Sequence, residues 1–251
     1  MNSFFAWIGG KNYLKKTIAD RMPKDFNRCI EVFGGAAWVL FYKDKYAEME
    51  VYNDYNSELV NLFRCVKYHC PEFQRELTFI LNSRETFNDF KCEKGLTDIQ
   101  RATRFFYLLK FSYGSNGRSY GCGKKDIAQV TEYLSRVEKR LSSVIIENKD
   151  FEDLIAVYDR PDAMFYLDPP YYQAERYYQV EFSEEDHLRL AKKLSAIKGK
   201  FLLSYNNCGF IKGLYKEYII EEVGRQHNLK TRYREADSEY KELLIRNYEL
   251  N

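Results

Sequence analysis

The chain has 251 residues, of which 45% are hydrophobic and 30% are charged, and its formal net charge is +2. This length and composition predict a globular protein with one domain and an insertion, or with one large and one small domain. They argue against a membrane protein, because no apolar run reaches eighteen residues, and the N-terminus lacks the pattern of a secretory signal, so we expect a cytoplasmic protein.

The first part of the chain alternates between predicted strands and helices. Residues 28–33 predict a short strand that ends at a Gly-Gly pair, and residues 36–42 predict a helix. Residues 50–53 predict a second strand that ends at an aspartate, and residues 57–68 predict a helix with apolar side chains at helical spacing. This order is typical of the start of a doubly wound α/β sheet.

The segment from residue 69 to residue 140 contains no clear buried strand. Helices are predicted over residues 98–111 and 127–141. Between them, residues 112–125 contain four glycines and predict a loop or a hairpin.

Strands and helices alternate again in the last part of the chain. A helix is predicted over residues 183–197, with Ser183 as its N-cap and acidic residues in its first turn. We therefore expect a split α/β domain, residues 1–56 and 142–251, with a mainly helical insertion at residues 57–141. Further strands are expected at residues 144–146, 163–167, 201–203, 218–221 and 243–246.

The strongest chemical signal is Asp168-Pro169-Pro170-Tyr171, which follows an apolar predicted strand. Two consecutive prolines fix the backbone and remove two amide donors, so the segment becomes a stiff shelf with a carboxylate, free carbonyls and an aromatic ring. Open α/β sheets bind ligands at this carboxyl edge of their strands. A proline-rich turn without a chemical role is the alternative interpretation.

Such a shelf suits methyl transfer to the exocyclic amine of adenine. This amine is a poor nucleophile because its lone pair is delocalised into the ring. The Asp168 carboxylate and a backbone carbonyl can each accept one amine hydrogen, which directs the lone pair toward an electrophilic methyl group. Tyr171 can hold the base by stacking on it.

A second signal is the turn formed by Phe33, Gly34 and Gly35. Glycines between a strand and a helix allow the backbone to approach a nucleoside cofactor. Asp54 follows Phe33 at close to the spacing of about 20 residues that is typical of a ribose-binding acid. The turn lacks the G-x-G-x-x-G pattern, so a dinucleotide is not expected. A tight turn followed by an acid at a helix N-terminus is the alternative.

A third signal lies near the N-terminus, where a Gly-Gly pair bends the chain between Trp7 and Lys11. Lys11 can pair with a carboxylate, and Trp7 can cover an apolar or cationic group. Taken alone, this segment predicts only a loop ahead of a helix.

The six cysteines are scattered and contain no C-x-x-C pair. We therefore expect reduced thiols and no metal site. The chain also lacks the Pro-Cys nucleophile that methyl transfer to carbon 5 of cytosine would need.

Together and in this order, the three segments resemble the Dam-like family of DNA adenine methylases. Residues 53–59, 203–206 and 242–248 also resemble segments of that family. The resemblance covers nearly all of the α/β part and is weakest in the insertion. It implies a Rossmann-like, S-adenosylmethionine-dependent methyltransferase core with a DNA-recognition insertion. The implied reaction is methylation of the N6 amine of adenine in double-stranded DNA, with the base flipped out of the duplex.

The resemblance also implies roles for individual residues. Trp7 and Lys11 would lie near the methionine part of the cofactor, Asp54 would accept from the ribose hydroxyls, and Asp150 and Phe151 would flank the cofactor's adenine. The cofactor-binding set is Trp7, Lys11, Phe33, Gly34, Gly35, Asp54, Asp150, Phe151 and Asp168. The catalytic set is Asp168, Pro169, Pro170 and Tyr171, in which the Pro169 carbonyl helps to hold the amine.

DNA contacts are expected from basic, polar and aromatic residues in or beside the glycine-rich loop. For each of them, a solvated loop residue is an equally good interpretation. The insertion lacks the sequence that is commonest in the recognition loop of the family, so the familiar GATC target is not implied. A second departure is Ala37, which stands where the family usually has a further glycine. The DNA-binding set is Arg101, Arg104, Tyr113, Asn116, Arg118, Tyr120, Lys124 and Lys125.

Several alternatives stay open at this point. The shelf could hold the N4 amine of cytosine, an RNA adenine or a protein glutamine. A DNA-binding relic without activity is a further alternative, against which the intact Lys11, Asp54, Asp168 and Tyr171 argue. A cognate restriction endonuclease is an open partner, and a monomer is the simpler oligomeric state.

Overall fold

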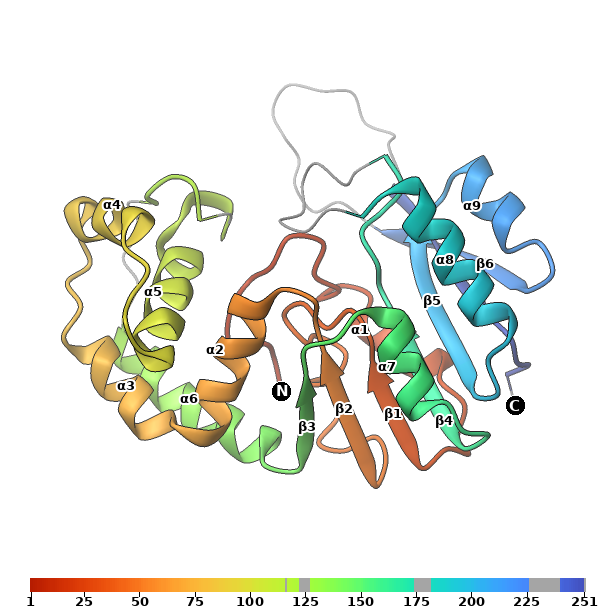
Figure 1. Cartoon of the computed structure of the whole chain (residues 1–251), viewed down its shortest axis with the longest axis horizontal. Coiled ribbons are helices and arrows are strands. Elements are labelled where there is room, and N and C mark those ends of the chain that lie inside the picture. The colour runs from red at the N-terminus through yellow and green to blue at the C-terminus, as the bar shows by residue number, and fades with distance from the viewer. Residues whose placement is uncertain (116, 122–126, 174–181, 226–239, 251) are drawn as a thin grey trace.

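A computed structural model describes residues 1–115, 117–121, 127–173, 182–225 and 240–250. Figure 1 shows a central sheet with helices packed around it and a group of helices at one end. Within the described residues, seven strands form this sheet in the order β3-β2-β1-β4-β5-β7-β6. The strands are β1 (Arg28–Glu31), β2 (Met49–Asn53), β3 (Val144–Glu147), β4 (Ala163–Leu167), β5 (Lys200–Asn206), β6 (Ile219–Arg225) and β7 (Tyr240–Arg246).

The first strand of the chain lies in the middle of the sheet. Strand β1 is parallel to its neighbours β2 and β4, and β3 and β5 continue the parallel order outward. Strand β7 inserts between β5 and β6 and is antiparallel to both. The strand order therefore reverses between β1 and β4, and open α/β sheets bind ligands at such a point. This topology confirms the predicted Rossmann-like α/β core.

Two layers of helices bury the two faces of the sheet, because neighbouring residues of a strand point to opposite faces. On β4, Phe165 packs with side chains of α7, α8 and α9, whereas Met164 and Tyr166 pack with those of α1. The helices are α1 (Lys15–Arg21), α7 (Phe151–Tyr158), α8 (Glu184–Ser195) and α9 (Gly209–Leu214).

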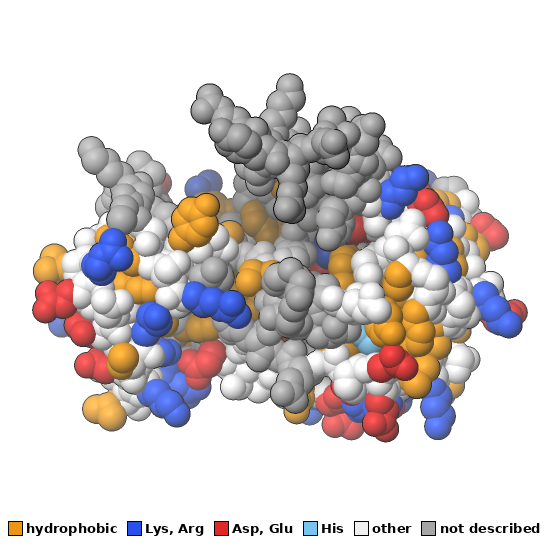
Figure 2. All heavy atoms as spheres, turned by 90° about the horizontal axis from the view of Figure 1, so that it is seen from above, with side chains coloured by type: hydrophobic (Ala, Val, Ile, Leu, Met, Phe, Trp, Pro, Cys, Tyr) orange, Lys and Arg blue, Asp and Glu red, His pale blue; other side chains and the backbone are white. Residues whose placement is uncertain are grey.

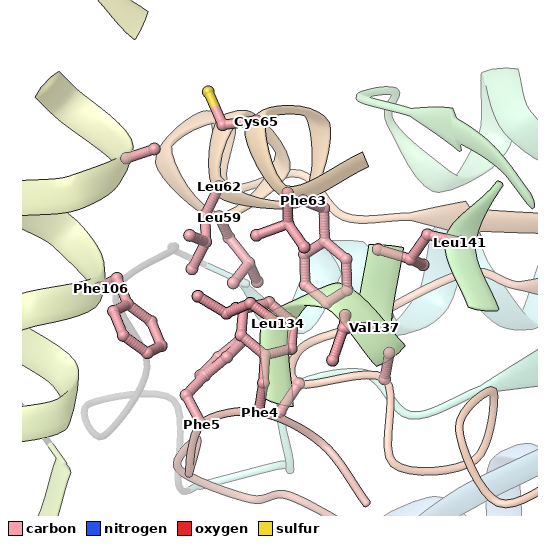
Figure 3. Close-up of a cluster of buried hydrophobic side chains, with 14 of the residues drawn as sticks. Phe4, Phe5, Leu59, Leu62, Phe63, Cys65, Phe106, Leu134, Val137 and Leu141 are labelled. Atoms are coloured by element: carbon pink, nitrogen blue, oxygen red, sulfur yellow. The ribbon is translucent and has the colours of Figure 1, made fainter. Parts of the chain in front are cut away.

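A second group of helices packs at the β3 end of the sheet. Figure 3 shows Phe4 and Phe5 of the N-terminal segment packed with Phe63 of α2, Phe106 of α5 and Leu134 of α6. The same apolar cluster includes residues of α2, α3, α5, α6, β2 and β3, so these helices and the sheet share one core. The division at residues 57 and 141 stays a prediction. The helices are α2 (Ser57–Tyr68), α3 (Cys70–Thr78), α4 (Arg84–Cys92), α5 (Asp98–Phe111) and α6 (Ile127–Leu141).

The helix predicted over residues 36–42 is wrong, because this segment forms turns. Gly35 and Ala37 have φ angles of 50° and 54°, in the left-handed region that interrupts a right-handed helix. The Leu40 N–H donates to the Glu31 carboxylate at 3.0 Å, and the Leu40 carbonyl accepts from Arg140 at 2.9 Å. These side chains take the place of helical hydrogen bonds.

The other predicted elements are confirmed, with shifts at their ends. Strands β5 and β7 extend beyond their predicted bounds because they pair with each other over five residues of β5. The N-cap at Ser183 is confirmed, since its Oγ accepts from the Asp186 N–H at 3.3 Å. Among the helices that the structure describes, none combines the length and the apolar character that a membrane crossing needs.

The glycine-rich loop is described in part. Ser112 and Tyr120 form an isolated antiparallel bridge, and the 3₁₀ helix η1 (Tyr113–Ser115) follows α5. The predicted DNA-binding residues Asn116, Lys124 and Lys125 lie outside the described residues.

Candidate active site

A pocket of about 850 Å³ lies where the strand order reverses, at the carboxyl ends of β1 to β4. Its wall is formed by the segments that follow these strands, by the N-terminal loop and by the start of α8. Pro169 and Tyr171 are not among its lining residues, but most of the predicted set is. The predicted residues that line the pocket are Trp7, Lys11, Phe33, Gly34, Gly35, Asp54, Asp150, Phe151, Asp168 and Pro170.

The turn after β1 brings backbone to the pocket surface. A Cβ atom at Gly34 would lie 2.2 Å from the Tyr52 ring, so this position requires glycine, and the positive φ of Gly35 favours glycine there. The Asp54 carboxylate holds this turn by accepting from the N–H groups of Gly35, at 2.9 Å, and of Asn56, at 2.8 Å. Burial raises the pKa of Asp54, and the backbone donors partly offset that rise.

The N-terminal loop carries Lys11 to the end of β4. Lys11 Nζ lies 2.7 Å from Asp168 Oδ1, and the two side chains are 6% and 16% exposed. Burial raises the pKa of Asp168 to about 6, against the opposing charge of Lys11, and the nearby carboxylate of Glu242 adds to the rise. The fold thus joins two residues that lie far apart in the sequence.

The Tyr171 hydroxyl is bound inside the protein. It donates to Glu242 Oε2 at 2.6 Å and lies 3.2 Å from Ser204 Oγ. Lys11 Nζ lies 3.8 Å from Glu242 Oε2 and 4.8 Å from the centre of the Tyr171 ring. Sequence reasoning assigned no role to Glu242 and Ser204, although both stand in segments that resemble the family. The sequence signal that could have identified Glu242 is its position as a charged residue directly before the apolar residues of β7.

Asp150 stands at the start of α7, where its Oδ1 accepts from the Glu152 N–H at 2.9 Å. The same oxygen accepts from Arg189 of α8 at 3.1 Å, and Arg189 also binds the Asp186 carboxylate at 2.6 Å. The Arg189 guanidinium lies 4.9 Å from the centre of the Phe151 ring. Sequence reasoning missed Arg189, because no local pattern connects α8 with α7.

Aromatic rings form the apolar part of the pocket wall. The ring centres of Phe33 and Phe151 lie 5.8 Å apart, and the Phe182 ring lies 5.8 Å from that of Phe33. Trp7 packs against Phe105 of α5 at 6.1 Å and so connects the pocket with the second group of helices. Phe182 was also missed by sequence reasoning.

The described members of the predicted DNA-binding set lie on the helical region rather than in the pocket. Tyr113 and Arg118 are exposed, and the Tyr120 hydroxyl donates to a side-chain amide. Arg101 is bound by two carboxylates, and Arg104 donates to a backbone carbonyl at 3.4 Å. Figure 2 shows Lys and Arg side chains, interspersed with acidic ones, on the left, where these helices lie. Their role in DNA binding stays a prediction.

A family model and two curated relatives match nearly the whole chain. A family model described as D12 class N6 adenine-specific DNA methyltransferase matches residues 7–229. The type II methyltransferase M1.LlaDCHI of Lactococcus lactis subsp. cremoris is 29% identical, over 99% of this chain and 96% of that protein. The type II methyltransferase M.MjaIII of Methanocaldococcus jannaschii is 27% identical, over 98% of each. The solved structure of the rRNA methyltransferase aviRa from Streptomyces viridochromogenes aligns with 95% of this chain and 83% of that chain, with a TM-score of 0.38 and 10% identity.

Proposed function

Because the chain belongs to the family of D12 class N6 adenine-specific DNA methyltransferases, we propose that its pocket binds S-adenosylmethionine beside an adenine amine held by Asp168. Membership of this family favours adenine in DNA over the amines of cytosine, RNA or protein. The observation that carries the proposal is the position of Asp168, which lines the pocket at the end of β4 together with the glycine turn.

The residues of the pocket fit the cofactor in size and chemistry. A volume of about 850 Å³ lies within the range of small-molecule sites, and a side chain at Gly34 would disrupt the turn that forms part of its wall. We assign the ribose hydroxyls to Asp54 and the cofactor's adenine to Asp150 and Phe151. Lys11 and Trp7 are assigned to the methionine part. When bound, S-adenosylmethionine supplies an electrophilic methyl group on a sulfonium.

The Asp-Pro-Pro-Tyr segment is assigned to the target base. The Asp168 carboxylate and the Pro169 carbonyl each accept one amine hydrogen, which makes the nitrogen more tetrahedral and directs its lone pair at the methyl group. Pro170 keeps the segment rigid, and the Tyr171 ring stacks on the base. With a pKa of about 6, Asp168 is mostly ionised at neutral pH, as an acceptor must be.

The helical region is assigned to DNA recognition. The target adenine must leave the duplex to reach a pocket at the strand ends. Exposed Tyr113 and Arg118 stand in the glycine-rich loop, where they can meet the groove and the phosphates. We assign these contacts to the full predicted set, Arg101, Arg104, Tyr113, Asn116, Arg118, Tyr120, Lys124 and Lys125.

We further infer that the protein acts as a monomer and protects DNA against a cognate restriction endonuclease. Both relatives are named type II methyltransferases, and one cofactor and one base suffice for one transfer. Light scattering should give the mass of one chain with and without DNA. DNA methylated by the enzyme should resist an endonuclease that cuts the same site.

The test of the proposed roles is transfer from labelled S-adenosylmethionine to unmethylated genomic DNA, followed by nucleoside analysis. We expect label in N6-methyladenine and, with Asp168→Ala, a loss of at least about a thousandfold while cofactor and DNA binding persist. The matched control is Asp162→Ala, a half-exposed carboxylate just before β4. Loss of both binding activities in Asp168→Ala would instead make Asp168 a structural residue.

A further inference from the structure

Glu242 is a buried carboxylate to which the proposed reaction assigns no part. It is 3% exposed, and the next three residues of β7, Leu243 to Ile245, are fully buried and apolar. An ionised group in such surroundings is costly unless it is paired. The fold therefore bears a cost at this position that an apolar residue would avoid.

Among the residues that the structure describes, the side-chain partners of Glu242 belong to the proposed site. Its Oε2 accepts from the Tyr171 hydroxyl at 2.6 Å and lies 3.8 Å from Lys11 Nζ, which lies 2.7 Å from Asp168 Oδ1. Asp168 and Tyr171 are the two ends of the Asp-Pro-Pro-Tyr segment. Lys11 and Glu242 thus link Asp168 to Tyr171 through side-chain contacts, in addition to the backbone of the segment.

Neighbouring polar groups on β5 hold the same segment. Ser204 Oγ lies 3.2 Å from the Tyr171 hydroxyl, and Asn206, which faces Glu242 in the β5–β7 ladder, donates to the Tyr172 carbonyl at 3.1 Å. Only the insertion of β7 between β5 and β6 brings Glu242 to this place. The antiparallel strand therefore supports the site as well as the sheet.

We propose that Glu242 is a positioning residue for methyl transfer, which fixes the Tyr171 ring for stacking and draws the charge of Lys11 partly away from Asp168. The first effect orients the target base. The second keeps the Asp168 carboxylate a strong acceptor for the amine hydrogen. This inference rests on the proposed function, because it needs Asp168 and Tyr171 in the roles given above.

The charged and titratable groups around Asp168 come from several elements and give the inference a specific signature. Lys11 of the N-terminal loop lowers the pKa of Asp168, whereas Glu242 of β7 raises it. Glu31 of β1 and the hydroxyls of Tyr166 and Tyr171 also face Asp168. Removing the charge of Glu242 lowers the pKa of Asp168, so the acid limb of kcat/KM should move to lower pH.

Two nearly isosteric variants separate the two effects. Glu242→Gln removes the charge and keeps an acceptor for the tyrosine hydroxyl, whereas Tyr171→Phe removes the hydroxyl and keeps the ring. We expect each to lower the single-turnover rate by about tenfold or more with little change in the KM for S-adenosylmethionine. Glu242→Gln alone should move the acid limb. The double variant should be less impaired than the product of the single effects, because the two residues act as a pair.

The chain offers a matched control in a second tyrosine–glutamate pair. The Tyr158 hydroxyl of α7 donates to Glu147 Oε1 of β3 at 2.8 Å, away from the Asp-Pro-Pro-Tyr segment. Tyr158→Phe and Glu147→Gln should keep the wild-type rate and acid limb.

The outcomes separate this inference from the proposed function. If the wild type labels adenine, Asp168→Ala does not, and Glu242→Gln keeps both the wild-type rate and the acid limb, the inference is overturned alone. If Asp168→Ala still transfers methyl groups, the proposed function fails first. Should Glu242→Gln not fold, Tyr171→Phe decides, and a rate equal to that of Tyr158→Phe overturns the positioning role.

Discussion

The polar groups at the strand ends are buried and bound to one another, whereas two of the side chains assigned to DNA on the helical region, Tyr113 and Arg118, face solvent. Lys11, Asp168 and Glu242 are at most 16% exposed, and Lys11 contacts both carboxylates. Tyr113, by contrast, is 77% exposed, and Arg118 is exposed as well.

This difference follows from what each of the two regions is proposed to bind. A site for one invariant reaction gains from groups that are already in place before the substrate arrives. A surface for DNA must expose side chains that the duplex can reach. The two regions are nevertheless joined, because α2, α5 and α6 share an apolar core with β2 and β3.

The largest effect is expected when a contact that joins the helical region to the sheet is broken. Arg140 of α6 binds both carboxylate oxygens of Glu50 of β2, at 2.8 and 2.7 Å, and both side chains are buried. Arg140→Met leaves the buried Glu50 without its charged partner, although its Oε1 still accepts from the Tyr46 N–H, and this should lower the free energy of unfolding by about 3–5 kcal/mol. Urea denaturation measures this, with exposed Arg136→Met of the same helix as the control. Two separate transitions would contradict the shared core.

The second-largest effect is expected on cofactor binding, from a change in the glycine turn that follows β1. Gly34→Ala places a Cβ against the Tyr52 ring and shifts the turn, so we expect a loss of cofactor affinity of about tenfold to a hundredfold. Calorimetric titration with S-adenosylmethionine measures it. In Gly213→Ala of α9, the new Cβ meets nothing within 4 Å, and affinity should not change. Equal affinities in the two variants would remove the glycine turn from the cofactor site.

The pH dependence of kcat/KM tests the buried carboxylate. Because the pKa of Asp168 is raised to about 6 and the ionised form is the acceptor, activity should be full above pH 7. Below pH 6 it should fall toward about tenfold per pH unit. DNA binding measured over the same range is the control. A flat profile from pH 5 to pH 8 would show that ionisation of Asp168 does not limit the reaction.

The smallest effect is expected on the exposed surface. Tyr113→Ala should change the free energy of unfolding by less than about 0.5 kcal/mol, since the ring packs on little. If the ring meets a base, the KM for DNA should rise at least fivefold, by about 1 kcal/mol or more, with unchanged cofactor affinity. Tyr68→Ala, a similarly exposed tyrosine of α2, is the control. An unchanged KM for DNA would leave Tyr113 as a solvated loop residue.

Sequence patterns predicted most of the elements, and most of the predicted cofactor and catalytic residues line the pocket. The glycine turn, Asp54 and the Asp-Pro-Pro-Tyr segment each follow a strand, and parallel strands bring their carboxyl ends to one edge. The segment at residues 36–42 was predicted wrongly as a helix, because Gly35 and Ala37 adopt left-handed angles that interrupt a right-handed helix. Buried side chains that are distant in the sequence stabilise these turns.

The sequence by itself therefore determined the class of fold, the order of the chemical segments and the residues at the ends of the strands, since these depend on local periodicity and on turn chemistry. The tertiary structure alone decided which side chains meet. Glu242 lies 71 residues from Tyr171, and Arg189 lies 39 residues from Asp150. Such contacts depend on how strands order themselves in the sheet and on which helix packs beside which, and no local pattern encodes either.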